Sequence, residues 1–190
     1  DEKDQLKEDI QEIELLITDL IEAERLNEEH AVLNADPTPI VAFVEGICEQ
    51  FESYPGGLEL ELPTEDREIV LDNLRIRLLI TNLVNNAIRH GEGNPIVVRI
   101  SFSGDFAHLE VEDNGEGIAE EHLLQISEPF YRADSSRQRN TGGFGLGLYL
   151  CRLIAKAHGG ELIIQSQLGE GTHIKVKLPP HPPLEEPMGE

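Results

Sequence analysis

Apolar residues at helical spacing mark the first part of the chain. Over positions 5–26 they recur at intervals of four and three residues, a heptad pattern that predicts one long amphipathic helix. The seam of this helix consists of Leu6, Ile10, Ile13, Ile17 and Leu20. Because such a helix cannot bury its apolar stripe alone, we expect it to join a helical bundle with another chain. The alternative is that it packs against the globular part of its own chain.

The pattern changes after Asp36-Pro37-Thr38-Pro39, which should end helical continuation. We therefore expect a helical segment over residues 1–35, a globular domain over 36–180, and a disordered tail rich in Pro and Glu over 181–190. Helical spacing predicts helices over 40–53, 74–90, 120–126 and 145–158, and alternation predicts strands over 58–62, 69–71, 96–102, 107–112, 161–167 and 172–178.

The order of these elements is not a simple repetition of strand, helix and strand. It favours an α+β fold, namely a two-layer α/β sandwich in which helices cover one face of a mixed sheet, preceded by the long helix. A chain of 190 residues is long enough for one domain with an appendage, or for two small domains.

Composition and charge exclude several classes of protein. No apolar run approaches the roughly 18–20 residues that span a membrane, so we expect no direct membrane contact. The net charge of −22 argues against binding to nucleic acid or anionic lipid. Cys48 and Cys151 form no metal-spaced pair, and two lone thiols fit core positions in a reducing compartment, the cytoplasm.

Polar residues interrupt the helix predicted over 74–90. Asn82, Asn86 and Arg89 in the sequence NLVNNAIRH lie at positions i, i+4 and i+7, so they share one helix face. Asn is locally unfavourable in a helix, and its carbonyl oxygen can help to hold Mg²⁺ while other positions remain open for phosphate and water. The alternative is that these are solvated residues of an ordinary helix.

The sequence DNGEG follows a predicted strand. Asp113 stands where the strand ends, and a carboxylate there can accept a hydrogen bond from an exocyclic amine such as that of adenine. Gly115 and Gly117 allow the backbone to approach a ligand closely. The same residues also occur in hairpin turns that bind nothing.

The sequence GGFGLGL opens a predicted helix. Gly143, Gly145 and Gly147 alternate there, and backbone amides at a helix start can cradle phosphate. The pattern is not a P-loop, because no Lys-Ser or Lys-Thr follows, and no simple βαβ unit surrounds it as in a Rossmann fold.

The segment before these glycines is unusually basic for this chain. Arg132, Arg137 and Arg139 stand there against one interior acid, Asp134. Arginines on a mobile flap can close over bound ATP and stabilise the charge that develops in phosphoryl transfer. The alternative is a solvated loop without a ligand.

Five ordered blocks resemble the catalytic and ATP-binding region of bacterial sensor histidine kinases, of the GHKL ATPase superfamily. NLVNNAIRH is similar to the N box, DNGEG to the G1 box, EPFYR to the F box, GGFGLGL to the G2 box, and GEGT at 169–172 to the last glycine motif. The resemblance covers residues 38–178. It implies the two-layer Bergerat fold and Mg-ATP as the ligand.

The resemblance also implies roles for single residues. Asn86 would coordinate Mg²⁺ with Asn82 beside it, Asp113 would bind the adenine amine, Arg89 would approach the phosphates, and His90 would lie near the nucleotide. Arg132, Arg137 and Arg139 would assist transfer with Asn86 and Arg89. Further nucleotide contacts would come from Gly115, Gly117, Ile118, Gly143, Gly145, Leu146, Gly147, Leu148 and Thr172. Phe144 departs from the small or hydroxyl residue that is commoner at its position.

The predicted parent reaction moves the γ-phosphoryl group of ATP to a histidine, and then to an aspartate of a response regulator. Residues 1–35 resemble the second helix of the dimerisation domain, which implies a homodimeric helical bundle and a parent anchored in the bacterial inner membrane. The family's acceptor histidine is followed by an acid, and none of the seven histidines here is. We therefore expect that the first helix is absent and that the fragment cannot phosphorylate itself.

Two other interpretations remain open. One is a GHKL ATPase of the gyrase-, Hsp90- or MutL-like type, which usually carries an acid as general base in its first motif; residues 75–90 contain no Asp or Glu. The other is a nucleotide-binding scaffold without transfer activity.

Overall fold

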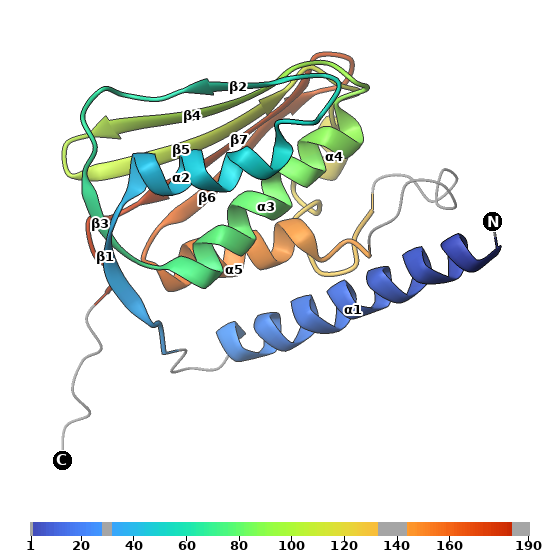
Figure 1. The fold of residues 1–190 in the computed structure, drawn as a ribbon, viewed down its shortest axis with the longest axis horizontal. Helices are drawn as coiled ribbons and strands as arrows, with labels where there is room; N and C mark the ends of the chain where they lie inside the picture. Colours follow the sequence, from blue (N-terminus) through green and yellow to red (C-terminus); the bar gives the residue numbers. More distant parts are fainter. Residues whose placement is uncertain (1, 28–31, 133–143, 184–190) are drawn as a thin grey trace.

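The computed structural model describes residues 2–27, 32–132 and 144–183. Within them, helices lie on one face of a mixed five-stranded sheet, so the expected two-layer α+β sandwich is confirmed (Figure 1). The strands lie in the order β2-β4-β5-β7-β6; β2 and β4 run parallel, and the other pairs are antiparallel. Their bounds are Leu58–Glu61 (β2), Ile96–Ser103 (β4), Phe106–Asp113 (β5), Glu161–Gln167 (β6) and Gly171–Leu178 (β7).

Three helices cover the sheet, namely α2 (Ile40–Cys48), α3 (Asn73–His90) and α5 (Gly147–Ala157). The side chain of Asp72 caps α3 by accepting a hydrogen bond from the Arg75 amide at 3.1 Å. The apolar residues of α3 recur every three or four positions and are buried: Ile76, Leu79, Ile80, Leu83, Val84 and Ala87. This burial leaves the polar face of α3 for the candidate site.

The sheet is apolar toward the helices and charged on its other face. In β4, Ile96, Val98 and Ile100 are buried beneath the helical layer, whereas Arg99 points to the open face. Alternation of this kind made the strands predictable from the sequence.

The sequence did not predict strand β1 (Ala35–Pro39), which pairs antiparallel with β3 (Glu68–Asp72). Its residues Asp36-Pro37-Thr38-Pro39 predict only the end of a helix and a domain boundary. Pro37 and Pro39 lie two residues apart, so both missing N–H groups fall on the same side of the strand, and the other side remains free to pair with β3. The strand is therefore compatible with both prolines.

Three predicted helices have different bounds in the structure. The helix expected over 40–53 is α2 followed by a 3₁₀ turn, Glu49–Phe51. The helix expected over 120–126 is α4 (Glu120–Leu123), after which the chain continues in turns. The helix expected from residue 145 begins at Gly147, because Gly145 has a φ of 75° and so lies outside helical geometry.

The first helix, α1 (Glu2–Asn27), is attached to the domain at its C-terminal end (Figure 1). Ala23 and Leu26 are buried, and Asn27 Nδ2 donates to Tyr149 Oη on α5 at 2.8 Å. This end therefore packs against its own chain, as in the alternative considered above. The heptad seam residues remain exposed, with exposed fractions from 40% to 60%: Leu6, Ile10, Ile13, Ile17 and Leu20. The bundle partner for this seam stays a prediction.

Both cysteines are buried and free, as expected for core residues. Burial raises the pKa of the Cys48 thiol to about 11 and raises that of Cys151 as well, so neither is a reactive thiolate. No helix in the described parts of the chain has the length and apolarity to cross a membrane.

Candidate functional site

Three chain segments meet at the C-terminal end of α3: the helix end itself, the turn after β5, and the turn between β6 and β7. Their backbones approach so closely that side chains are excluded. A Cβ on Gly115 would lie 1.8 Å from the His90 carbonyl oxygen, one on Gly117 would lie 2.0 Å from that of Gln167, and one on Gly171 would lie 2.0 Å from that of Asp113. The glycines expected to allow close approach to a ligand thus also allow close approach of these segments to one another.

Asp113 lies at the centre of this junction and is 6% exposed. Its Oδ1 accepts a hydrogen bond from the Gly115 amide at 3.0 Å, and the backbone amide of Thr172 on the neighbouring strand donates to the carboxylate as well. Burial raises the pKa of Asp113, although these amides and the nearby His90 act in the opposite direction. A buried carboxylate in a fixed orientation can select a ligand that donates a hydrogen bond to it.

Ser166 on β6 was not predicted from the sequence. Its hydroxyl accepts from the Ile118 amide at 2.8 Å, donates to the Gly171 carbonyl at 2.7 Å, and lies 2.9 Å from Thr172 Oγ1. It thereby joins the turn after β5 to the final hairpin. Alternation places Ser166 on the inner face of β6, opposite Thr172 in the strand register, and a polar residue there was the available signal.

Asn82 connects α3 to the start of α5. A Cβ on Gly147 would lie 3.2 Å from Asn82 Oδ1, so the helix start passes directly over this side chain. Asn82 Nδ2 is buried and has no hydrogen-bond partner among the described residues. Because a buried donor without a partner is costly, the position fits an acceptor such as a phosphate oxygen or a bridging water.

The remaining residues of the N box follow along the same helix. Asn86 is half-buried and Arg89 is exposed, and both lie between Asn82 and His90 on α3. No group of three or more His, Cys, Asp or Glu side chains in the described chain is placed to hold a metal ion. A single Asn oxygen is compatible with Mg²⁺, which usually keeps several waters and takes its other ligands from phosphates.

The described residues on either side of the predicted flap are held together. The Phe130 amide donates to the Gly145 carbonyl at 3.0 Å, and a Cβ on Gly145 would lie 2.6 Å from the Tyr131 carbonyl. Arg132 is half-buried at this position. The predicted residues Arg137, Arg139 and Gly143 lie outside the described residues, as do residues 184–190 of the predicted tail.

Two apolar residues of the predicted glycine block face the protein interior. Leu146 is 3% exposed and precedes the first turn of α5, and Leu148 packs against the core. Both could still shape the site by fixing the start of α5. Ile118, half-buried, is anchored through its amide to Ser166.

Comparison with known proteins identifies the family of this chain. Residues 71–182 match the family model described as Histidine kinase-, DNA gyrase B-, and HSP90-like ATPase. The sensor protein SrrB of Staphylococcus aureus (strain MRSA252) is 31% identical over 189 residues, which cover 94% of this chain and 32% of that protein. The chain therefore spans about a third of the length of the curated relatives it matches.

Solved structures share the fold. The histidine kinase AdeS of Acinetobacter baumannii superposes with a TM-score of 0.75 at 24% identity, covering 93% of this chain and 82% of that one. Full-length ShkA in complex with AMPPNP gives 0.72 over 91% of this chain and 36% of that one. The catalytic domain of the histidine kinase ThkA gives 0.68 over 79% of this chain and 98% of that one.

The fold and the family match together define the class of protein as a histidine kinase-type ATPase domain. The chain belongs to the Histidine kinase-, DNA gyrase B-, and HSP90-like ATPase family.

Proposed function

We propose that this chain binds ATP together with Mg²⁺ at the site formed by α3, the turn after β5 and the start of α5. The observation that carries the proposal is the buried carboxylate of Asp113, held by two backbone amides where α3 and both glycine turns meet. Asp113 would accept a hydrogen bond from the adenine amine. The family resemblance and the ShkA complex with AMPPNP support the same ligand class.

The roles of the other residues follow from their positions. Asn86 would supply the protein ligand to Mg²⁺, and the unpartnered Nδ2 of Asn82 would donate to a phosphate oxygen or its water. Arg89 and Arg132 would neutralise phosphate charge, with Arg137 and Arg139 as further candidates. Magnesium would offset the repulsion between the triphosphate and a chain with a net charge of −22.

In the parent protein, the domain would present the γ-phosphoryl group to a histidine on a dimerised helical bundle, and a response regulator would receive it. The domain's part in this reaction is positioning and charge neutralisation. Residues 75–90 offer no carboxylate that could act as a general base for water, which favours transfer over hydrolysis. We expect no self-phosphorylation, because none of the seven histidines precedes an acid.

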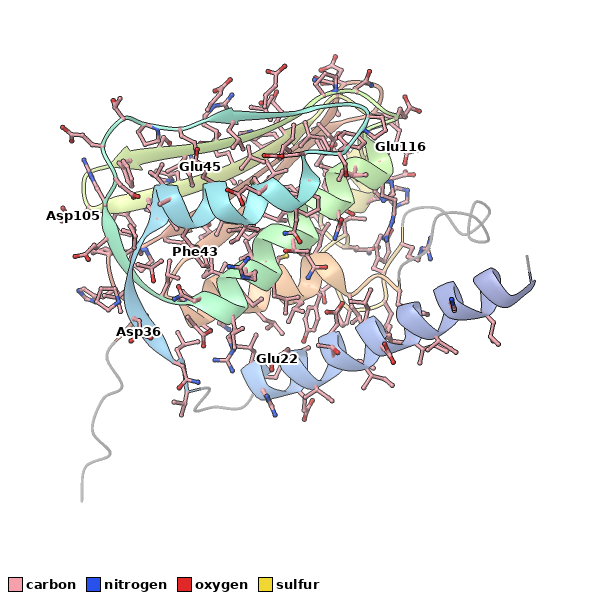
Figure 2. The ribbon with its side chains drawn as sticks, viewed as in Figure 1. Glu22, Asp36, Phe43, Glu45, Asp105 and Glu116 are labelled. Carbon is pink, nitrogen blue, oxygen red and sulfur yellow. The ribbon has the colours of Figure 1, made fainter. Side chains whose placement is uncertain are left out.

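The test is calorimetry with a nonhydrolysable ATP analogue and Mg²⁺. Asp113→Ala and Asn86→Ala should each weaken binding at least tenfold. Asp105→Ala, which removes an exposed acid from the turn before β5, at the opposite end of that strand from Asp113, should leave binding unchanged (Figure 2). Equal affinity of the unchanged protein and both site variants would contradict the proposal. An acid-labile phosphoryl label on the chain after incubation with γ-labelled ATP would contradict the expectation of no self-phosphorylation.

A further inference from the structure

Glu116 connects the turn after β5 to two other parts of the molecule. Its amide donates to the His90 carbonyl at 3.3 Å, and its carbonyl accepts from the Gly169 amide at 2.8 Å. Its side-chain Oε1 lies 2.8 Å from His90 Nδ1. Figure 2 labels Glu116 beside the C-terminal end of α3. One residue thus joins the last residue of α3, the turn after β5, and the turn between β6 and β7.

The neighbours of Glu116 restrict its position further. Gly115 and Gly117 pass against the carbonyls of His90 and Gln167 with no room for a Cβ. The amide of Gly115 also orients the carboxylate of Asp113. A shift of residue 116 relative to α3 would therefore carry the Gly115 amide with it and change the direction of the Asp113 carboxylate.

We infer that Glu116 is a positioning residue for the base end of the nucleotide site, acting through its tie to His90 rather than by touching the nucleotide. The inference rests on the proposed function. Its chemical consequence is base selectivity. A carboxylate aimed at the base edge accepts a hydrogen bond from the exocyclic amine of adenine, whereas guanine presents a carbonyl oxygen at the equivalent position and is repelled.

The electrostatic surroundings explain why a carboxylate suits position 116. The charged groups near His90 are Asp113 on β5, Glu116 on the turn, and Arg89 and Glu92 beside it along the chain. The side chains of His90 and Glu116 are 43% and 39% exposed, so the interaction between them contributes only modestly in free energy. The expected effect of losing it is correspondingly a few-fold change in affinity, with the two backbone hydrogen bonds retained.

The test measures the affinities of three variants of the chain for nonhydrolysable analogues of ATP and of GTP in the presence of Mg²⁺. Glu116→Ala should weaken ATP-analogue binding about fivefold and lower the preference for adenine over guanine. Glu116→Gln should bind within about twofold of the unchanged protein, because its amide oxygen can still accept from His90 Nδ1. Glu45→Ala, which removes an exposed acid from α2, is the matched control (Figure 2).

A general loss of structure would weaken both nucleotides equally, so the adenine-to-guanine ratio separates positioning from destabilisation. The ¹⁵N chemical shift of His90 Nδ1 provides a second measurement and should change in Glu116→Ala but not in Glu45→Ala. If the unchanged protein binds no nucleotide, the proposed function fails and this inference with it. If it binds, and Glu116→Ala shows the same affinity and base preference, this inference alone is wrong.

Discussion

The imidazole of His158 accepts a hydrogen bond of 3.0 Å from the backbone amide of Asp72, which joins the end of α5 to the start of α3. The other ring nitrogen, Nδ1, donates to the Ile154 carbonyl at 2.8 Å. One nitrogen accepts and the other donates, so the ring is neutral. Asp72 in turn caps α3 and accepts from the Asn34 amide at 3.0 Å. A neutral histidine therefore supports the start of the helix that carries the candidate site.

This relationship predicts acid sensitivity of the fold. Burial lowers the pKa of His158 from its ordinary value of 6.5. Below pH 6.5 the unfolded chain binds a proton that the folded chain resists, so this contribution to stability is complete above 6.5 and declines as the pH falls. The loss should reach at most about 1.4 kcal/mol per pH unit. Urea unfolding at pH 7.5, 6.5 and 5.5 measures it.

His158→Gln provides the control for that measurement. Its amide oxygen can still accept from the Asp72 amide, but the side chain does not titrate. The variant should lose less stability than the unchanged protein between pH 7.5 and 5.5. Equal losses in both proteins would show that His158 is not the titrating group.

The attachment of α1 should respond to pH in the opposite direction. Burial raises the pKa of Asp19 to about 6. A folded-state pKa above the ordinary 3.8 means that the contribution to stability is present below 3.8 and is lost as the pH rises through about 6. Asp19→Asn should therefore stabilise the docked helix at pH 7.5, by on the order of 1 kcal/mol after allowance for partial solvent exposure. Hydrogen exchange of the last turns of α1 reports the change.

Glu24→Gln is the matched comparison for this prediction, because Glu24 is an exposed acid on the same helix. Glu24→Gln should leave the amide exchange rates in the last turns of α1 unchanged at pH 7.5 and at pH 5. At pH 5 the difference between Asp19→Asn and the unchanged protein should shrink, since Asp19 is then largely protonated. A difference that persists undiminished at pH 5 would be inconsistent with titration of Asp19.

The open face of the sheet is stabilised by charges that alternate across neighbouring strands. In register across β2, β4, β5 and β7 stand Glu61, Arg99, Glu110 and Lys175. Glu110 is 8% exposed and lies 3.1 Å from Lys175 Nζ, 2.8 Å from His173 Nε2 and 3.5 Å from Arg99 Nη1. Burial alone would raise the pKa of Glu110, but the hydrogen bonds and the electrostatic attraction of Lys175 and His173 together outweigh it, and the pKa is lowered.

Glu110→Ala should therefore destabilise the fold by about 1–2 kcal/mol, because it leaves the cations Lys175 and Arg99 and the imidazole of His173 without their shared partner. Glu112→Ala on the same strand and face should cost less, since Glu112 is half-exposed and lies 3.7 Å from Arg99. The stability that Glu110 supplies is present above its ordinary pKa of 4.5 and is lost as the pH falls through the lowered value. Urea unfolding of the two variants tests whether Glu110→Ala loses more stability than Glu112→Ala, and an equal loss in both would contradict the prediction.

Periodicity explains which parts of the fold were predictable. The alternation in β4 and β5 and the apolar spacing in α3 arise because each element buries one face. The spacing of apolar residues along the sequence is therefore enough to locate these elements. Strand β1 lacks such a signal. Thr38 is the one buried residue of this strand, and the pairing of the strand depends on the distant β3. Local patterns do not report pairing of that kind.

The candidate site likewise has residues that local sequence patterns indicate and contacts that they do not. Asp113, Asn82 and the glycines were recognisable because their residue types are unusual at those positions. The tie between His90 and Glu116 joins residues 26 positions apart, and Ser166 lies 48 positions from Ile118. Such contacts are set by how the two turns meet around the end of α3. The close backbone approach at Gly115, Gly117 and Gly171 defines this junction, and local sequence patterns do not report it.

Nucleotide binding should be linked to the ionisation of Asp113. Burial raises the pKa of the free carboxyl group, and a hydrogen bond from the adenine amine would favour its charged form. Binding should therefore release protons at acidic pH, and affinity should fall as the pH drops toward the raised pKa. Calorimetry in two buffers of different ionisation enthalpy, at pH 7.5 and 5.5, measures the protons released. The phosphates of the nucleotide titrate too, so Asp113→Asn is measured in parallel, and only the difference between the two proteins is assigned to Asp113. Equal proton release by both proteins at pH 5.5 would mean that Asp113 does not change its ionisation when the nucleotide binds.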